Sequence, residues 1–420
     1  MSIARRIALA LAVVATSAAA TARAADFALK DGDRVVFYGD SITDQRQYTV
    51  YTEAYALTRF PDRVITFIHS GWGGDRVNGG GGGPIDVRLD RDVIAYRPTV
   101  VTVMLGMNDA SYQPFKEEIF KTYREGYQHL VERLKREVPG VRLTLIRPSP
   151  YDDVTREPSI GDGYNKVLVR YGEFVEELAR KEGATVADLN APVVEALKKA
   201  RELDEKEARN LIFDRVHPGH AVQLLMAEAL LKAWDAPATV TAVVIDAEGK
   251  TVAKAEKTRI DGLEVDSKKL TWTQDDEALP MPIDLRDGQI ALAVKSSDVM
   301  KALNQETLQV KGLGEGDYVL KVDGQEVGTF SRKDLGEGIN LAEHDTPMAR
   351  QARDVLGLTR RHNDLHFVRW RMVQVPLQDD GLRSYSTAID ALDALEGDLV
   401  SKQRAAAKPK QRRFELAPKS

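Results

Sequence analysis

A regular alternation of short apolar runs and amphipathic segments between Arg34 and Trp234 is the feature that most constrains the fold. The apolar runs are dense in Val, Ile, Leu and Thr, as strands buried on both faces of a sheet are; they read RVVFY, RVITFIH, VVTVML, VRLTLI and TVADL. Segments between them, such as residues 115–137, place an apolar side chain at every third or fourth position, which is typical of helices. The alternation predicts an α/β domain over residues 25–235, a doubly wound parallel five-stranded sheet with helices on both faces.

The sequence changes character after Pro237. Strand-like runs with turn signals at AEG and VDGQE predict a small antiparallel β domain over residues 236–335; the runs are VTAVVIDAEGKTV, LTWT, IALAV, TLQVKGL and GDYVLKVDGQEVGTF. Helical patterns return over residues 336–400, a segment that can pack back on the first domain. A chain of 420 residues is longer than one hydrophobic core usually serves, so two or three units are expected.

Residues 401–420 form a basic tail. Between Lys402 and Arg413 the chain carries six basic residues and no acidic one. Such a block can bind polyanions, but like charges in a row usually stay solvated. We expect a partly disordered end and assign it no function.

The first 24 residues have the pattern of a signal peptide. Arg5 and Arg6 precede an apolar stretch, and small residues then lead to Ala22-Arg23-Ala24, the A-x-A form that signal peptidases cut. This stretch is too short for a membrane span, and no other stretch reaches the roughly 18 uninterrupted apolar residues that a span needs. We therefore expect an exported protein, periplasmic or extracellular. Export by the Sec route fits the flanking residues better than the twin-arginine route that Arg5-Arg6 suggests.

Charge and cysteine content narrow the range of partners. The formal net charge is −5, and −8 once the three arginines of the leader are removed, so the chain has no general attraction to nucleic acid or anionic lipid. The sequence contains no cysteine. An exported chain without disulfides must rely on its hydrophobic cores for stability.

Ser41 lies in FYGDSIT, where the first predicted strand ends. Ligands on parallel sheets bind where strands end and helices begin. At such a turn the backbone amide of Ser41 would lie near a helix N-terminus, which favours developing negative charge. The alternative is that Ser41 or Thr43 only caps the next helix. This segment alone does not decide between a nucleophile and a cap.

The segment DRVHPGH supplies the two further groups that a serine nucleophile needs, a base and an acceptor that orients the base. Asp214 and His217 are three residues apart, so their side chains can lie within hydrogen-bond reach in one turn. Pro218 suits the first position of a helix, which would leave His217 in the preceding loop.

Two more groups follow predicted strands. Asn108, in GMND, comes after the third strand, and its amide can donate an N–H to an oxyanion. Gly74, in GWGGD, comes after the second strand, and a glycine lets a backbone N–H approach a substrate oxygen without a Cβ in the way. The ends of the first three strands therefore each contribute one candidate.

The four segments GDSIT, GWGGD, GMND and DRVH resemble, in order and spacing, the blocks of the SGNH hydrolase superfamily, also called GDSL esterases. The similarity covers roughly residues 33–235, about half the chain, and the one departure, Ile42 for the usual leucine, is conservative. It implies a flavodoxin-like sheet with Ser41 as nucleophile, His217 as base and Asp214 as its partner. It also implies an oxyanion hole formed by the Ser41 and Gly74 amides and the Asn108 side chain.

We therefore hypothesise an exported carboxylic ester hydrolase (EC 3.1.1.-) that works through an acyl-enzyme and needs no metal or organic cofactor. Export and the appended β domain suit removal of acetyl groups from a carbohydrate, so the expected partner is a small ester or an acetylated polysaccharide. The alternatives are a lipase, arylesterase or thioesterase of the same superfamily, and an inert glycan-binding scaffold. The complete set of four blocks argues against the scaffold.

The run NGGGGGP after Gly74 contains five consecutive glycines. Such a run carries high backbone entropy, so we expect a mobile loop beside the oxyanion hole. No Gly-Lys-Ser/Thr follows it, which argues against a phosphate-binding loop.

The remaining histidines have spacings that a metal can use. His362 and His366, in HNDLH, lack the glutamate of HExxH, so we expect a structural or surface role and no metal site. His220 is expected to lie in the first turn of the last helix of the α/β domain.

Asp40 precedes Ser41 directly, so it is expected to hold the loop through backbone contacts rather than to act as the catalytic acid. Trp272 and Tyr318 lie in short predicted strands, where aromatic residues are more often core than glycan platforms.

Overall fold

The structure is a computed structural model, and it describes residues 26–266 and 269–419. The expected signal peptide, residues 1–24, lies outside these ranges. Within them, no helix is both long enough and apolar enough to cross a membrane.

A five-stranded sheet forms the centre of the N-terminal half, and every neighbouring pair of its strands is parallel. Its order is β2-β1-β5-β6-β7. Counted along this sheet the order is 2-1-3-4-5, which is the flavodoxin-like order. The strands are β1 (Arg34–Gly39), β2 (Thr66–Gly71), β5 (Val100–Met104), β6 (Arg142–Arg147) and β7 (Thr185–Asp188). The predicted fold class is confirmed.

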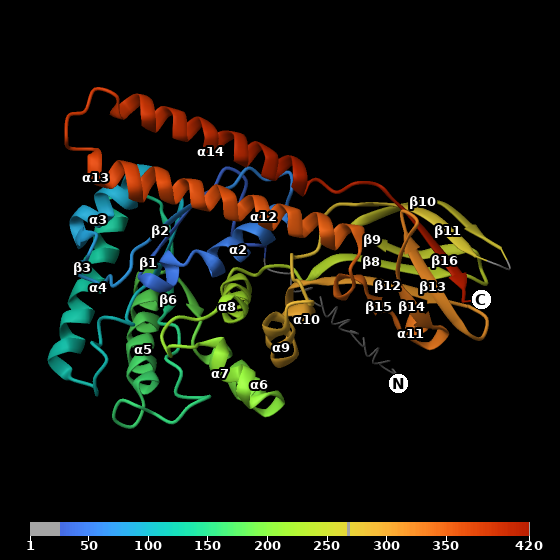
Figure 1. Cartoon of the computed structure of the whole chain (residues 1–420), viewed down its shortest axis with the longest axis horizontal. Coiled ribbons are helices and arrows are strands. Elements are labelled where there is room, and N and C mark those ends of the chain that lie inside the picture. The colour runs from blue at the N-terminus through green and yellow to red at the C-terminus, as the bar shows by residue number, and fades with distance from the viewer. Residues whose placement is uncertain (1–25, 267–268, 420) are drawn as a thin grey trace, which may run out of the picture.

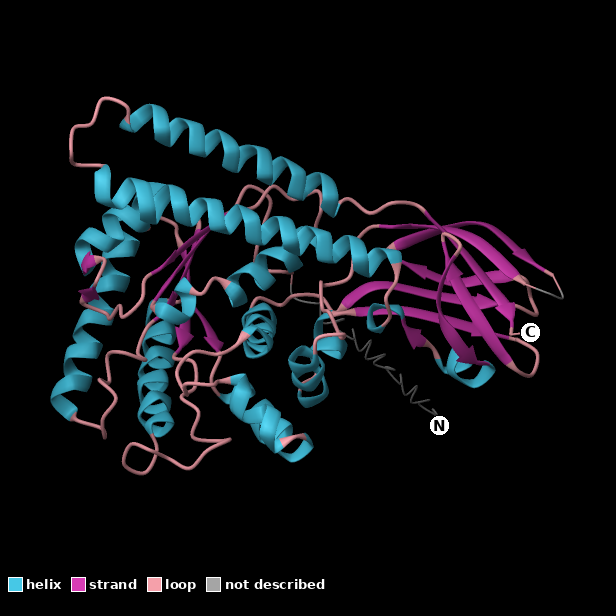
Figure 2. Ribbon diagram, viewed as in Figure 1, coloured by secondary structure: helices cyan, strands magenta, loops and turns pink. Residues whose placement is uncertain are grey.

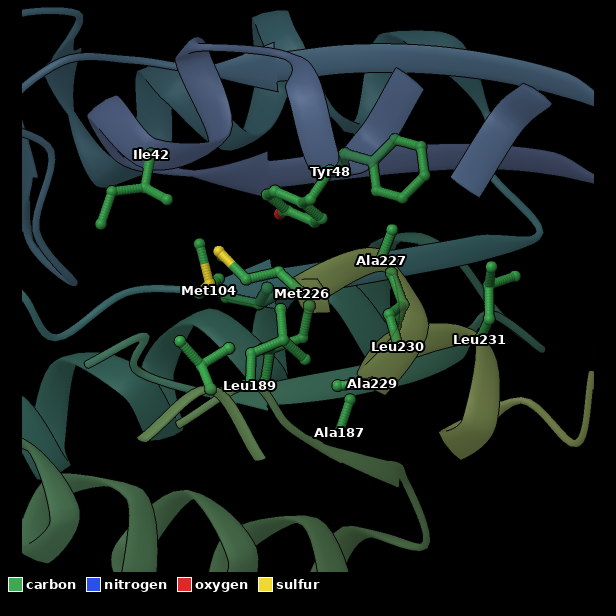
Figure 3. Packing of buried hydrophobic residues seen from close by; sticks show 14 of the residues in the cluster. Ile42, Tyr48, Met104, Ala187, Leu189, Met226, Ala227, Ala229, Leu230 and Leu231 are labelled. Carbon is green, nitrogen blue, oxygen red and sulfur yellow. The ribbon is translucent and has the colours of Figure 1, made fainter. Parts of the chain in front are cut away.

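Helices pack on this sheet through apolar stripes of the kind the sequence predicts. In α4, for example, the buried residues recur every three or four positions from Phe120 to Leu134. The helices are α1 (Ser41–Asp44), α2 (Gln47–Arg59), α3 (Ile85–Asp92), α4 (Glu117–Glu137), α5 (Tyr164–Glu182), α6 (Ala191–Leu203), α7 (Glu205–Leu211) and α8 (His220–Ala233), with a 3-10 turn at Ile94–Tyr96. Figure 3 shows part of this core, where Ile42, Met104 and Met226 come from α1, β5 and α8.

The C-terminal half contains two sheets around a second core, seen as the magenta strands on the right of Figure 2. Their orders are β10-β11-β16-β13-β14 and β15-β12-β8-β9. The strands are β8 (Thr239–Asp246), β9 (Thr251–Glu256), β10 (Thr258–Val265), β11 (Leu270–Asp276), β12 (Gln305–Lys311), β13 (Asp317–Val322), β14 (Gln325–Ser331), β15 (Ile339–Asn340) and β16 (Arg412–Pro418). Trp272 and Tyr318 are buried in this core, as expected.

This region is not purely antiparallel, and in that respect the prediction is wrong. β8 and β12 pair in parallel. Parallel neighbours need a long crossover, which the chain makes through β9 to β11 and the short helices α9 (Gly288–Ser296) and α10 (Val299–Leu303). The run IALAV, predicted as a strand, lies in α9, where the Asp287 side chain accepts hydrogen bonds from the Gln289 and Ile290 N–H groups. A short apolar run does not distinguish a strand from a buried helical turn. Here the N-cap at Asp287 favours the helix.

The prediction that residues 401–420 form a partly disordered tail is also wrong. Residues 401–407 belong to α14 (Tyr385–Ala407), and residues 412–418 form β16, which lies between β11 and β13. Phe414 and Leu416 alternate with polar neighbours and are fully buried. Their burial in the second core outweighs the solvation of the surrounding basic residues.

Replacing Phe414 with alanine should therefore destabilise the C-terminal half by about 3–5 kcal/mol, the usual cost of removing a buried aromatic ring. The ring stacks on Trp272 with centroids 5.0 Å apart. Urea unfolding followed by tryptophan fluorescence measures the change, and Glu415→Ala on the same strand is the matched control. A loss below about 1 kcal/mol would mean that β16 is not a core strand.

A helical hairpin connects the two halves. α12 (Pro347–Phe367) continues through a π-helical segment (Val368–Gln374) and α13 (Val375–Leu377), and the chain returns along α14 to β16. Figure 1 shows the two long orange and red helices lying along the α/β domain. The remaining short elements are β3 (Gly79–Gly80), β4 (Gly83–Pro84), α11 (Arg332–Glu337) and a 3-10 turn at Leu341–Glu343.

Buried polar side chains attach this hairpin to α2 and β2. The carboxylate of Glu53 accepts hydrogen bonds from Asn363 at 3.1 Å and from Gln403 at 3.1 Å. His362 and His366 are each 6% exposed and lie beside Glu53 and Glu396, respectively. Among the described residues no group of three or more ligating side chains is arranged to hold a metal ion. The histidine pair is therefore buried and not on the surface.

Candidate active site

Ser41 is the first residue of α1, and only Asp40 separates it from the end of β1. The helix cap is its neighbour Asp40, whose carboxylate accepts the Ile42 N–H at 3.0 Å. Thr43 is not the cap either, because its hydroxyl shares a hydrogen bond with the Tyr48 hydroxyl. The half-buried Ser41 hydroxyl is therefore not used for capping.

Asp40 holds the loop through a backbone contact, as expected. Its side chain is fully buried, and burial raises the pKa of this carboxyl to about 7. The Ile42 N–H opposes that rise, because a hydrogen bond favours the charged form.

The structure brings His217 and Asp214 to Ser41 across 176 positions of sequence. The His217 Nε2 atom lies 2.8 Å from Ser41 Oγ, and its Nδ1 atom lies 2.6 Å from Asp214 Oδ2. An Nδ1–H donated to the carboxylate leaves Nε2 as the acceptor for the serine proton. These three side chains therefore form a continuous chain of hydrogen bonds.

Asp214 is fixed by its own loop. Its Oδ1 atom accepts the backbone N–H groups of Val216 at 2.9 Å and His217 at 2.8 Å. Burial alone would raise the pKa of Asp214, but the hydrogen bonds from the His217 backbone and ring and from Val216 outweigh it and lower the pKa. The carboxylate is therefore ionised at neutral pH. The helix α8 begins at His220, after Gly219, so Pro218 stands outside the helix, not at its first position.

Arg215 supports this loop, and no sequence motif indicates that role. Its backbone is in the left-handed region, with φ 71°. Its carbonyl accepts the Asp152 N–H at 2.9 Å, and its guanidinium donates to the Glu157 carbonyl at 2.8 Å. These hydrogen bonds to residues outside the turn stabilise the strained backbone between Asp214 and His217.

Gly74 and Asn108 lie on the loops that follow β2 and β5. Gly74 has φ +78°, a backbone conformation that glycine adopts without strain. A Cβ built on the preceding Gly73 would lie 4.0 Å from the Ser41 Cβ, so this loop borders Ser41. Asn108 donates from Nδ2 to the Asp75 carbonyl at 3.0 Å, which joins the two loops. Within residues 26–266 and 269–419, the backbone N–H groups of Ser41 and Gly74 have no hydrogen-bond acceptor.

The five glycines after this loop, for which the sequence predicts mobility, lie in a short hairpin, β3 and β4. They are required by close packing. A Cβ on Gly79 would overlap the Gly83 carbonyl, and one on Gly82 would overlap the side chains of Arg88 and Trp72. Contacts with buried neighbours compensate the backbone entropy that the glycines lose.

Tyr112 is a second residue that the sequence does not reveal. Ser111 and Tyr112 both have positive φ, 57° and 51°, which turns the Tyr112 ring back toward the site. Its hydroxyl donates to Asn108 Oδ1 at 3.0 Å, and its ring stacks on Tyr164 with centroids 5.1 Å apart. Because the Asp75 carbonyl can only accept, Asn108 Nδ2 must face it, and the Tyr112 hydroxyl holds the other end of the amide.

Two exposed aromatic side chains belong to the loops that carry Asn108 and Asp214. Phe213, next to Asp214, is 75% exposed, and Tyr112 is 39% exposed.

The chain is similar to known hydrolases over this region and beyond it. Residues 37–223 match the GDSL-like lipase/acylhydrolase family. An acetylxylan esterase from Geobacillus stearothermophilus is 26% identical over 219 residues, which cover 48% of this chain and 93% of that protein. The solved structure of a gut microbial diltiazem-metabolizing enzyme is 29% identical with a TM-score of 0.80, and the match covers 93% of this chain and 98% of that one.

The match to the diltiazem-metabolizing enzyme includes the C-terminal half of this chain. The two proteins therefore share both the α/β domain and the β region. The family match falls on the α/β domain that carries Ser41, Gly74, Asn108 and His217. Residues 37–223 therefore resemble an esterase or acylhydrolase of the GDSL family, and these similarities support placing the α/β domain in the SGNH hydrolase superfamily.

Proposed function

We propose that the protein is an exported serine esterase that removes acetyl groups from a carbohydrate through a covalent acyl-enzyme. The observation that carries the proposal is the hydrogen-bonded chain from Ser41 Oγ through His217 to Asp214. A serine hydroxyl is weakly nucleophilic by itself, and this arrangement supplies both the base and the acceptor that orients the base.

The reaction proceeds in two steps. His217 Nε2 takes the Ser41 proton as Oγ attacks the ester carbonyl, and the imidazolium then protonates the leaving alcohol. Water attacks the acyl-enzyme with His217 again as base, and the acid is released. Asp214 fixes the tautomer of the imidazole and stabilises its charged form, without itself accepting the proton. Every step is a proton or acyl transfer between these side chains, substrate and water.

The oxyanion of each tetrahedral intermediate is bound by the N–H groups of Ser41 and Gly74 and by Asn108. The two backbone groups have no acceptor among the described residues, which leaves them available to the substrate. The second Asn108 N–H is similarly available, because its amide is fixed at Asp75 and Tyr112. Loss of one such donor commonly costs about 3–4 kcal/mol of transition-state stabilisation.

Tyr112→Phe should lower kcat by roughly tenfold, because the amide of Asn108 loses the hydrogen bond that orients it. Asn108→Ala should lower kcat by about 10²- to 10³-fold. In the Asn108→Ala background Tyr112→Phe should have little further effect, since the two residues act as a unit. Steady-state hydrolysis of p-nitrophenyl acetate by the four proteins tests this. Fully additive losses would contradict a role for Tyr112 in orienting Asn108.

The acetylated carbohydrate is favoured by the acetylxylan esterase relative and by the exposed Phe213 and Tyr112 rings, on which a sugar ring can stack. A second candidate substrate is a small drug-like ester, because the relative that matches almost the whole chain metabolizes diltiazem, a molecule that carries an acetate ester. Both candidates require the same chemistry at Ser41.

One substrate panel separates these possibilities. It contains acetylated xylan, pectin and mannan, O-acetyl sialic acid, diltiazem, and p-nitrophenyl acetate and octanoate, each with Ser41→Ala as the blank. The proposal expects acetate release from one of the carbohydrates at the highest kcat/KM. A higher value for diltiazem would favour the drug-like ester, and a much faster octanoate than acetate would favour a lipase. No turnover of any ester would contradict the proposal.

Export is the remaining part of the proposal, and it rests on residues 1–24 alone. Expression of the full chain in a bacterial host should yield a mature protein that begins at Ala25, outside the cytoplasm. N-terminal sequencing of the fractionated protein tests this, and an uncleaved cytoplasmic product would contradict it.

A further inference from the structure

We propose that Trp370 and Arg371, in the C-terminal helical hairpin, are positioning residues that hold the Trp72–Asp75 loop of the oxyanion hole. This inference rests on the proposed function. It assigns a role in the active site to a segment that lies outside residues 37–223. The C-terminal half is then part of the hydrolytic machinery, because it aligns the Gly74 amide.

Trp370 reaches the loop through a buried network. Its indole N–H donates to Asp92 Oδ1 at 2.6 Å, a contact between residues 278 positions apart. Asp92 also pairs with Arg88, and Arg88 donates from Nε to Asp75 Oδ2 at 2.7 Å. The side chains of Arg88, Asp75 and Asp92 are fully buried, and Trp370 is 1% exposed.

The other end of this network is the oxyanion hole itself. Asp75 follows Gly74 directly, and its backbone carbonyl accepts the Asn108 Nδ2–H at 3.0 Å. The side chain of Asp75 is fixed by Arg88, so movement of Arg88 would move both the Gly74 peptide and the partner of Asn108. Hydrogen bonds between charged groups are strong and directional in a buried site, and such a network transmits position well.

Arg371 contacts the same loop at the Trp72 side chain. Its guanidinium stacks over the Trp72 ring, while Trp370 meets that ring edge-on with centroids 5.7 Å apart. Trp72 is therefore held between two consecutive residues of the π-helical segment. That segment inserts an extra residue per turn relative to an α-helix, and such segments are frequent at functional sites.

Asp44 links Arg371 to the backbone of the loop. Its Oδ2 atom accepts the Gly73 N–H at 3.2 Å. Burial raises the pKa of Asp44, and the charge of Arg371 is the largest opposing effect. Asp44 is also in α1, three residues after Ser41, so the loop is fixed relative to the nucleophile as well as to Asn108.

These contacts predict a particular kinetic effect. A loop displaced by a fraction of an ångström still admits the substrate, but its N–H no longer meets the developing oxyanion. Variants at these two positions should therefore change kcat far more than KM. A purely structural role of the hairpin would show itself as a lower melting temperature, with kcat unchanged in the folded fraction.

Three variants and one matched control test the inference in the full chain. Trp370→Phe keeps an aromatic side chain, though a smaller one, and removes the N–H, and Asp92 Oδ1 keeps its second partner, Arg91. Arg371→Ala removes the stacking and the charge, and Arg371→Lys retains the charge. The control is Arg369→Ala, which breaks an ion pair with Asp393 of α14 at 2.7 Å in the same segment. It loosens the hairpin without touching the loop.

We expect Trp370→Phe and Arg371→Ala to lower kcat by about 10- to 100-fold with KM changed less than threefold. Arg371→Lys should regain most of the loss, and Arg369→Ala should leave kcat within twofold. Equal losses in Arg369→Ala would overturn the inference, since they would mean that general attachment of the hairpin is what matters. Unchanged kcat in both Trp370→Phe and Arg371→Ala would overturn it as well.

A second readout does not depend on ester hydrolysis. Amide hydrogen exchange of peptides covering residues 72–82 should become faster in Trp370→Phe and Arg371→Ala, but not in Arg369→Ala. If this exchange changes as expected while the wild type cleaves no ester, the support of the loop stands and the proposed function fails. If the wild type is an esterase and the exchange does not change, the proposed function stands and the positioning role fails.

Discussion

Ser41→Ala is expected to lower kcat on the order of 10⁶-fold. The oxygen that forms the acyl bond is lost, and neither His217 nor the oxyanion donors can replace it. Ser41 makes no capping bond in α1, because Asp40 is the cap, so the folded structure should tolerate alanine. The variant therefore tests the chemical step without disturbing the fold.

The measurement is release of nitrophenol from p-nitrophenyl acetate, corrected for spontaneous hydrolysis, together with the melting temperature. We expect an unchanged melting temperature and residual activity near the background. Activity within a hundredfold of the wild type in a pure preparation would mean that another group performs the attack.

Asp214→Asn is expected to lower kcat by about 10⁴-fold at neutral pH. Asparagine is nearly isosteric, and its side-chain oxygen can still accept the Val216 and His217 backbone N–H groups that shape the loop. What changes is the group facing His217 Nδ1. An amide N–H there favours the tautomer with its proton on Nε2, which cannot accept the Ser41 proton.

The pH dependence follows from the lowered pKa of Asp214. A carboxylate with a lowered folded-state pKa contributes stability above its unfolded pKa and loses it as the pH falls through the folded value. Asp214 should therefore stay ionised down to pH values below about 4. Loss of wild-type activity well above that pH is then not caused by protonation of Asp214. A kcat for Asp214→Asn within tenfold of the wild type would contradict the role of Asp214.

The candidate site could be read from the sequence because its signals are local. Ser41, Gly74 and Asn108 each follow a predicted strand, and parallel strands bring their carboxyl ends to one edge of the sheet. Asp214 and His217 are three residues apart, so one turn suffices to bring them together. The alternation of elements predicts a parallel sheet, whereas the order of its strands is implied only by the resemblance to the SGNH hydrolases.

The supporting residues could not be read in this way. Tyr112 depends on two consecutive residues with positive φ, and neither Ser111 nor Tyr112 is a residue type that signals this conformation. Trp370 meets Asp92 across 278 positions, and no local pattern encodes such a pair. The charged residues around Phe414 concealed a short alternation of buried and partly exposed side chains. In each case a tertiary contact determined the outcome.

Covalent labelling of Ser41 is the measurement that tests the central claim most directly. A fluorophosphonate reacts with an activated serine, and mass spectrometry of the digested protein locates and counts the adducts. We predict one adduct per chain, on the peptide that contains Ser41, absent from Ser41→Ala and formed much more slowly by Asp214→Asn. An unlabelled Ser41 in folded wild-type protein, or an adduct that persists in Ser41→Ala, would contradict the assignment of Ser41 as the nucleophile.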